Sequence, residues 1–168
     1  MRSTIEHLGY LPVGVGLLAT SPQLLEGFLK ANALFERTTL DPLAREVLIM
    51  TIATRNGCHI CIAMHTARLH ALAATTETIN ALRDQRELDD PRLEAMRRFT
   101  LQVIDDAGAV SAKTLETFMS HGYTPQNALE VILGIGTYTM STLANRMTRA
   151  PLDEQLAAYA PQDHSAAR

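Results

Sequence analysis

The amino-acid sequence predicts an all-α protein, on three observations. A side chain able to cap a helix stands directly before proline at four points, glycine follows two of the helical segments, and no segment alternates between apolar and polar residues as a half-buried strand does. With 168 residues, 46% of them hydrophobic, the chain can bury one good core and does not need two. We predict one domain over 1–168, with an irregular segment at 1–20 and a frayed tail at 160–168.

Each predicted helix has a marked start or stop. The cap-and-proline pairs Ser21-Pro22, Asp41-Pro42, Asp90-Pro91 and Thr124-Pro125 open four of the helices. Glycine, which takes up the left-handed conformation readily, ends two of the predicted helices, 42–55 at Asn56-Gly57 and 111–121 at His121-Gly122. About seven helices result, and they cover 22–37, 42–55, a segment from about Cys58 onward, 76–86, 91–106, 111–121 and 125–149.

Composition excludes several classes of protein. Fifteen basic residues stand against 18 acidic ones, no run of like charges occurs, and we therefore expect no nucleic-acid partner. The longest apolar run is far below the roughly 18 residues of a membrane span, and the start lacks a secretion signal, so we expect a soluble cytoplasmic protein. No glycine-rich phosphate loop is present, and we expect no cofactor.

Both cysteines of the chain lie in one short stretch, "RNGCHICIAMH". On a helix Cys58, Cys61 and His65 project from one face, with Cys61 and His65 one turn apart. The helix begins at about Cys58, where backbone N–H groups and the positive end of the dipole favour thiolate over thiol, as a cationic imidazole beside Cys61 would. The pattern is typical of a nucleophilic thiol.

Two other readings of the cysteines remain open. A structural zinc site needs four ligands, whereas only His65 joins the pair and His70 points elsewhere, so we expect no metal. Two buried, inert cysteines are the other alternative, because free cysteine is among the most buried residue types.

Glu46 is the next candidate, because its helical neighbours three, four and seven residues away are all apolar. In the helical hairpin implied by the Asn56-Gly57 turn, Glu46 is about 16 Å before the turn and His65 about 12 Å after it, so the two lie nearly level. We expect burial to raise the pKa of Glu46 and the pair to relay a proton. A buried ion pair with an arginine is the alternative.

The order E-x11-C-x2-C-x3-H, formed by Glu46, Cys58, Cys61 and His65, resembles the signature of the alkylhydroperoxidase D (AhpD) branch of the carboxymuconolactone decarboxylase-like superfamily. The similarity extends to the preceding helices and to the closing helix "GYTPQNALEVILGIGTYTMSTLANRM". It implies an AhpD-like helical fold that assembles as a homotrimer or hexamer.

The resemblance also implies a peroxidase cycle. Cys61 would attack a small hydroperoxide and become a sulfenic acid, Cys58 would resolve it as a disulfide, and a dithiol reductant, lipoyl or thioredoxin-like, would reduce the pair. Glu46 and His65 would relay the proton. AhpD itself has a histidine directly before the second cysteine, where this chain has Ile60; His59 comes one position earlier and is rotated about 100° from Cys58.

Tyr138 and Asn145, seven residues apart on the closing helix, are further candidates for lining the cysteines, although such residues commonly make ordinary hydrogen bonds. The apolar segment "ALEVILGIGTY" exceeds what one helix face buries in a domain of this size and favours a subunit contact. Two other functions stay open: a carboxymuconolactone decarboxylase-type enzyme, whose relatives generally lack C-x-x-C, and a non-catalytic redox-sensing or structural module.

Overall fold

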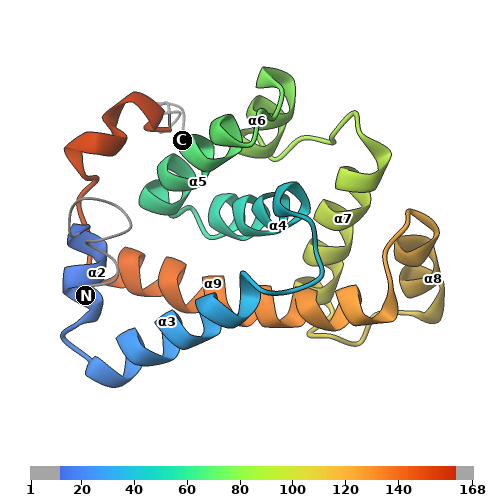
Figure 1. Cartoon of the computed structure of the whole chain (residues 1–168), viewed down its shortest axis with the longest axis horizontal. Coiled ribbons are helices and arrows are strands. Elements are labelled where there is room, and N and C mark those ends of the chain that lie inside the picture. Colours follow the sequence, from blue (N-terminus) through green and yellow to red (C-terminus); the bar gives the residue numbers. More distant parts are fainter. Residues whose placement is uncertain (1–11, 162–168) are drawn as a thin grey trace.

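The computed structural model describes residues 12–161. Within that range the chain forms eight α-helices and one 3-10 helix and no strand, so the all-α prediction is confirmed (Figure 1). In chain order the elements are α2 (Val13–Leu18), α3 (Pro22–Phe35), α4 (Pro42–Arg55), α5 (His59–Ala71), α6 (Thr76–Arg83), α7 (Pro91–Asp105), α8 (Ala112–Ser120), α9 (Pro125–Met147) and η1 (Glu154–Tyr159).

Helix α4 is the centre of the fold. Every residue from 46 to 54 is buried, and α5, α6, α7 and α9 pack around the helix, as Figure 1 shows. The long helix α9 runs along one side of this core and carries α3 on its surface. The close approach depends on Gly134 of α9, since a Cβ there would lie 2.7 Å from both Leu48 Cδ2 of α4 and Phe35 Cε2 of α3.

The four helix-capping residues predicted from the sequence are confirmed. The side chains of Ser21, Asp41, Asp90 and Thr124 each accept a hydrogen bond from a backbone N–H in the first turn of the helix that follows. These bonds satisfy donors that a helix start leaves without an intrahelical partner. The predicted glycine turns are present as well, since Gly57 and Gly122 have φ of +62° and +87°.

Two short helices were not predicted. Residues 13–18, which the sequence analysis assigned to an irregular segment because of their glycines, form α2. This helix packs on α3 and α9, and tertiary contact outweighs the low helix propensity of glycine. The second is η1, close before the predicted tail. The parts of the two irregular segments at 1–11 and 162–168 lie outside the described residues.

The predicted end of the helix at 42–55 is confirmed, whereas the other five predicted helix ends are one to three residues too long. The helix predicted at 76–86 ends at Arg83, because the chain turns at Asp84 and Gln85, and Gln85 has a φ of +57°. The closing helix ends at Met147, two residues before the predicted end.

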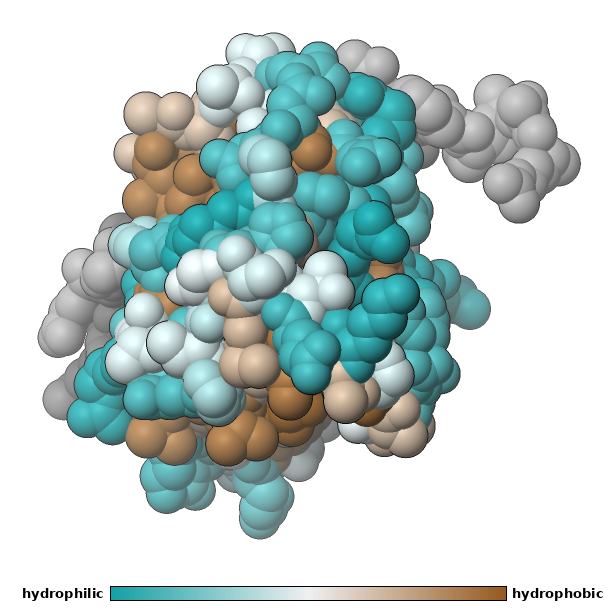
Figure 2. All heavy atoms as spheres, turned by 90° about the vertical axis from the view of Figure 1, so that its right-hand side faces the viewer, coloured by the Kyte–Doolittle hydropathy of each residue, from teal (hydrophilic) through white to brown (hydrophobic). Residues whose placement is uncertain are grey.

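The outer side of α9 leaves apolar side chains uncovered. Leu129, Ile132, Leu143 and Met147 are 47–79% exposed and recur at helical spacing along one stripe. Figure 2 views the molecule from the α7–α8 end, and hydrophobic residues gather along the lower edge of this face.

Within 12–161, no helix is long and apolar enough to cross a membrane.

Candidate active site

The cysteine pair sits at a tight turn between α4 and α5. Asn56 ends α4, Gly57 takes the left-handed conformation, and the Cys58 N–H donates back to the Ala53 carbonyl at 2.9 Å. Cys58 is the N-cap residue of α5, and Cys61 lies in its first turn. From α9, Arg146 donates to the Asn56 carbonyl and so fixes the turn. The sequence therefore places both thiols at a helix start, as predicted.

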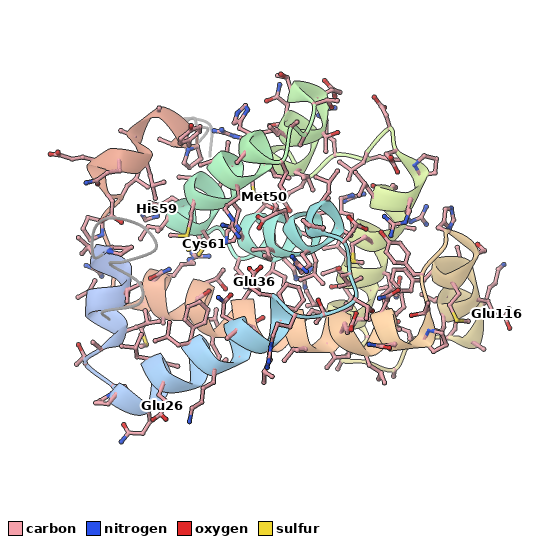
Figure 3. All side chains as sticks on the ribbon, in the orientation of Figure 1. Glu26, Glu36, Met50, His59, Cys61 and Glu116 are labelled. Atoms are coloured by element: carbon pink, nitrogen blue, oxygen red, sulfur yellow. The ribbon has the colours of Figure 1, made fainter. Side chains whose placement is uncertain are left out.

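The two cysteines are free thiols that share a hydrogen bond, with 2.9 Å between their sulfur atoms. Cys58 is 1% exposed and Cys61 5%. Figure 3 shows Cys61 at the N-terminal end of α5, on the side that faces α9. The arrangement joins the two sulfurs by one hydrogen bond in a buried site from which water is largely excluded.

The hydrogen bond between the two sulfurs shifts the pKa values of the two cysteines in opposite directions. The hydrogen bond from Cys61 lowers the pKa of Cys58 to about 7, against the effect of burial, and backbone N–H groups of Cys61 and Ile60 and the side chain of Asn145 contribute to this lowering. The bond to Cys58, burial and the Cys58 charge raise the pKa of Cys61 well above its usual value. Cys58 is therefore the more acidic of the two cysteines, whereas the family pattern assigns attack to Cys61.

Glu46 and His65 meet as predicted. The Nδ1 atom of His65 lies 2.7 Å from Oε2 of Glu46, and the side chains are 9% and 5% exposed. Arg68, one turn further along α5, brings its Nε to 3.6 Å from the other carboxylate oxygen. The hairpin geometry read from the Asn56-Gly57 turn is therefore confirmed, and the arginine partner that was left as an alternative is present too.

The expected direction of the Glu46 pKa was wrong. Burial is the largest single effect and would raise the pKa, but the charge and hydrogen bond of His65, together with those of Arg68, outweigh burial and lower it. Local sequence shows an apolar surround on α4, whereas the two partners of the carboxylate, His65 and Arg68, come from α5. Glu46 is thus an ionised carboxylate that orients His65.

Tyr138 borders the same region from α9. Its ring meets the His65 ring edge-on at 5.5 Å between centroids, and its hydroxyl donates to Asn32 Oδ1 of α3 at 2.8 Å. Burial, the main cause, raises the pKa of Tyr138, so the hydroxyl stays protonated. Tyr138 supports the ring of His65 and takes no part in the cysteine hydrogen bond. Asn32 could not be found from sequence, because only the packing of α3 on α9 brings it here.

Asn145 is the residue of α9 that reaches the thiols directly, with Nδ2 3.5 Å from the Cys61 sulfur. Ser141, one turn before it, also favours the ionised form of Cys61. Sequence reasoning found Asn145 and missed Ser141, although the spacing of four residues was a usable signal.

One expected contact is missing from the described residues. No hydrogen bond joins His65 to either cysteine there, so the one-turn spacing of Cys61 and His65 does not by itself couple them. His59 is exposed, as its rotation on the helix predicts, and lies at the cysteine end of α5 in Figure 3. Of the described residues, no three histidine, cysteine, aspartate or glutamate side chains converge as metal ligands would.

A hollow of about 620 Å³ lies elsewhere, between α7 and α8. Its lining includes Glu87, Arg98, Lys113 and His121 and none of the residues around the thiols. The hollow is therefore separate from the buried titratable groups described above.

Comparison with known proteins agrees with the fold. Residues 22–102 match the model of the Carboxymuconolactone decarboxylase family. No curated protein sequence matches the chain. Among solved structures, the chain is similar to an AhpD-core, uncharacterised peroxidase-related protein from Ralstonia eutropha JMP134, with 19% identity, a TM-score of 0.82, and coverage of 92% of this chain and 84% of that one.

Two further structures share the arrangement of helices. A peroxidase-related protein from Silicibacter sp. TM1040 has 19% identity and a TM-score of 0.79, over 92% of this chain and 83% of that one. A cysteine-to-alanine variant of the debrominase Bmp8, in complex with 2,3,4-tribromopyrrole, has 14% identity and a TM-score of 0.76, over 94% and 86%. At these identities the likeness concerns the fold.

Proposed function

We propose that the chain is an AhpD-like member of the carboxymuconolactone decarboxylase-like superfamily and acts as a thiol-dependent hydroperoxide reductase, which the family match over residues 22–102 and the AhpD-like fold support. The observation that carries the proposal is the pair of free thiols joined by a hydrogen bond of 2.9 Å at the start of α5. A thiolate is the nucleophile that cleaves a peroxide bond, and a second thiol at this distance can resolve the product.

The reaction proceeds in two balanced steps. Cys58 first loses its proton to solvent, the Cys61 thiol then passes its own proton to the Cys58 thiolate, and the resulting Cys61 thiolate attacks the terminal oxygen of the hydroperoxide, which breaks the O–O bond and leaves a Cys61 sulfenic acid and an alkoxide. The alkoxide takes a proton and leaves as the alcohol. Cys58 then attacks the Cys61 sulfur, hydroxide departs with the Cys58 proton as water, and a disulfide remains.

The Glu46–His65 pair supplies the proton for the alkoxide in this scheme. The ionised carboxylate accepts from Nδ1 of His65 at 2.7 Å, which fixes the orientation of the ring and leaves Nε2 for proton transfer. Tyr138 holds the ring edge-on, and the exposed His59 stands outside the proton path.

An external dithiol, of lipoyl or thioredoxin-like type, closes the cycle by reducing the disulfide. We infer that the reaction takes place in the cytoplasm, because a pair that must return to two free thiols needs a reducing compartment. We also infer a homotrimer or hexamer, because the apolar stripe of α9 would be covered in such an assembly.

The test is a thiol count on the reduced protein before and after one equivalent of cumene hydroperoxide. We expect two thiols to be lost, one equivalent of alcohol to form, and the mass to fall by two hydrogens. Cys61→Ser should abolish alcohol formation, whereas Cys58→Ser should still give a sulfenic acid that dimedone traps. Labelling of Cys58 in Cys61→Ser, with none in Cys58→Ser, would reverse the two roles.

An unchanged thiol count would remove the proposal. Turnover of a lactone carboxylic acid by protein with unreacted thiols would favour a decarboxylase instead. Loss of two thiols without alcohol release above the rate of the uncatalysed reaction would favour a redox-sensing module.

A further inference from the structure

Asn145 of α9 is buried in an unusual way for an asparagine. Its side chain is 9% exposed, its Nδ2 donates to the Cys61 sulfur, and its Oδ1 has no hydrogen-bond partner among the residues that the structure describes. A buried carbonyl oxygen without a partner destabilises a fold, because it loses its bond to water and gains none.

A second buried asparagine on the same helix shows what a structural role requires. Asn127 donates from Nδ2 to Thr39 and Glu130, and its Oδ1 accepts from both the backbone N–H and the hydroxyl of Thr124. Both ends of that amide are therefore satisfied. Asn145 instead gives its hydrogen bond to sulfur, a weak acceptor as a thiol and a better one as a thiolate.

Helix α2 holds the Asn145 amide against the thiols. Gly14 lies beside Oδ1, and a Cβ at this position would stand 2.7 Å from that oxygen, closer than real Cβ atoms come to their neighbours. Gly16, two residues further along α2, faces open space. Of these two glycines in one short helix, only Gly14 is required, because only there would a Cβ clash with a neighbouring atom.

We propose that Asn145 stabilises the negative charge that Cys58 and Cys61 share, and that Gly14 leaves the space in which the amide is held against the Cys61 sulfur. A donor in this position stabilises thiolate more than thiol, and it lowers the pKa of both cysteines. The same N–H can follow the charge as the proton passes from Cys61 to Cys58. The amide thereby eases formation of the attacking Cys61 thiolate in a site that contains little water.

The inference rests on the proposed function for its use in catalysis, but its test does not. The reduced protein is alkylated with iodoacetamide across pH 5 to 10, and mass spectrometry reports the modified cysteine and the midpoint pH. The midpoint is the readout, since intrinsic nucleophilicity also changes with pKa. Hydroperoxide takes no part, so loss of peroxidase activity and loss of this effect are separate results.

In the parent we expect a midpoint near pH 7, carried by Cys58. Asn145→Ala should raise the midpoint by about one pH unit, which lowers the thiolate fraction at pH 7 roughly fivefold. Asn145→Asp, of nearly the same shape, should raise it further by adding a negative charge. Asn127→Ala should lower thermal stability and leave the midpoint unchanged.

Gly14→Ala and Gly16→Ala form the matched pair. Each adds one methyl group to α2 and improves its helix propensity, so both should fold. Gly14→Ala displaces the amide and should raise the midpoint, whereas Gly16→Ala should match the parent. The proposal is overturned if folded Asn145→Ala, or Asn145→Asp where the alanine variant does not fold, titrates like the parent. A shift in the Asn145 variants without one in Gly14→Ala supports the amide's role and overturns that of Gly14.

Discussion

At the scale of single residues, the site combines two buried pairs of side chains, each joined by a hydrogen bond. Cys58 and Cys61 are joined by a hydrogen bond, which lowers the pKa of Cys58 to about 7. Glu46 and His65 form the second pair, in which the charge is fixed and the ring is oriented. Because no hydrogen bond between described residues joins the pairs, the substrate's own oxygen atoms would provide the link between sulfur and imidazole.

Replacing Glu46 with glutamine tests whether this carboxylate serves the reaction or only stabilises the fold. Glu46→Gln keeps the shape but removes the charge that orients His65, so we expect the peroxide-dependent rate to fall by roughly two to four orders of magnitude. Stopped-flow oxidation of the reduced variant measures this. Glu94→Gln is the control, because Glu94 is equally buried and paired with Arg97 but distant from the thiols. A Glu46→Gln protein that reacts at the parent rate would leave the carboxylate with a structural role only.

The lowered pKa of Glu46 also predicts a pH window for stability. A carboxylate whose pKa is lower in the folded than in the unfolded state stabilises the fold above about pH 4.5, and this contribution disappears as pH falls through the folded value. The parent should therefore exceed Glu46→Gln in unfolding free energy by about 1–3 kcal/mol at pH 7, with a smaller gap below pH 4.5. Urea unfolding at pH 7 and pH 3.5 gives the comparison, and a gap that widens in acid would contradict it.

At the scale of elements, the turn between α4 and α5 and the close packing of α9 build the site. The sequence predicted most of this framework, since capping residues before proline mark where α3, α4, α7 and α9 begin, and Gly57 marks the turn that brings Glu46 level with His65. Helix α2 was missed because its two glycines resemble breakers, while its stability comes from packing on α3 and α9. Arg68 and Asn32 were missed because tertiary pairing of helices brings them to the site, whereas the spacing of Ser141 from Asn145 could have revealed it.

The approach of α9 to α3 and α4 gives a prediction at this scale. In Gly134→Ala the new methyl group meets Leu48 and Phe35 at 2.7 Å, and such overpacking costs about 1–3 kcal/mol. Gly27→Ala, within α3 and facing open space, should instead stabilise by up to about 1 kcal/mol. Thermal unfolding of both variants checks the pair; equal shifts would mean that Gly134 is not required for close packing.

At the scale of the whole molecule, the uncovered apolar stripe on α9 is the main feature that one copy of the chain leaves unexplained. Leu129 and Met147 mark its two ends, 73% and 79% exposed. A stripe of this length at helical spacing is suited to the same stripe, or an adjoining face, of another copy.

Introducing a charge into the stripe tests the assembly. Leu143 is 54% exposed, so Leu143→Glu should leave the fold intact and disperse the oligomer into protomers of 18.4 kDa. Leu143→Met, which preserves apolar area, should sediment like the parent. Sedimentation velocity at micromolar concentration is the measurement, and a parent that already sediments as a protomer would contradict the assembly.

The hydrogen bond from the Val13 N–H to Asp153 joins positions 140 residues apart, and it does so at the cysteine end of the molecule. The first and last described helices, α2 and η1, therefore flank the thiols, while the connection between α7 and α8 lies on the far side (Figure 1). A circular permutant opened at that connection would carry its new ends away from the cysteine pair. Fusion partners and surface tethers attached there would leave the cysteine end of the molecule unobstructed.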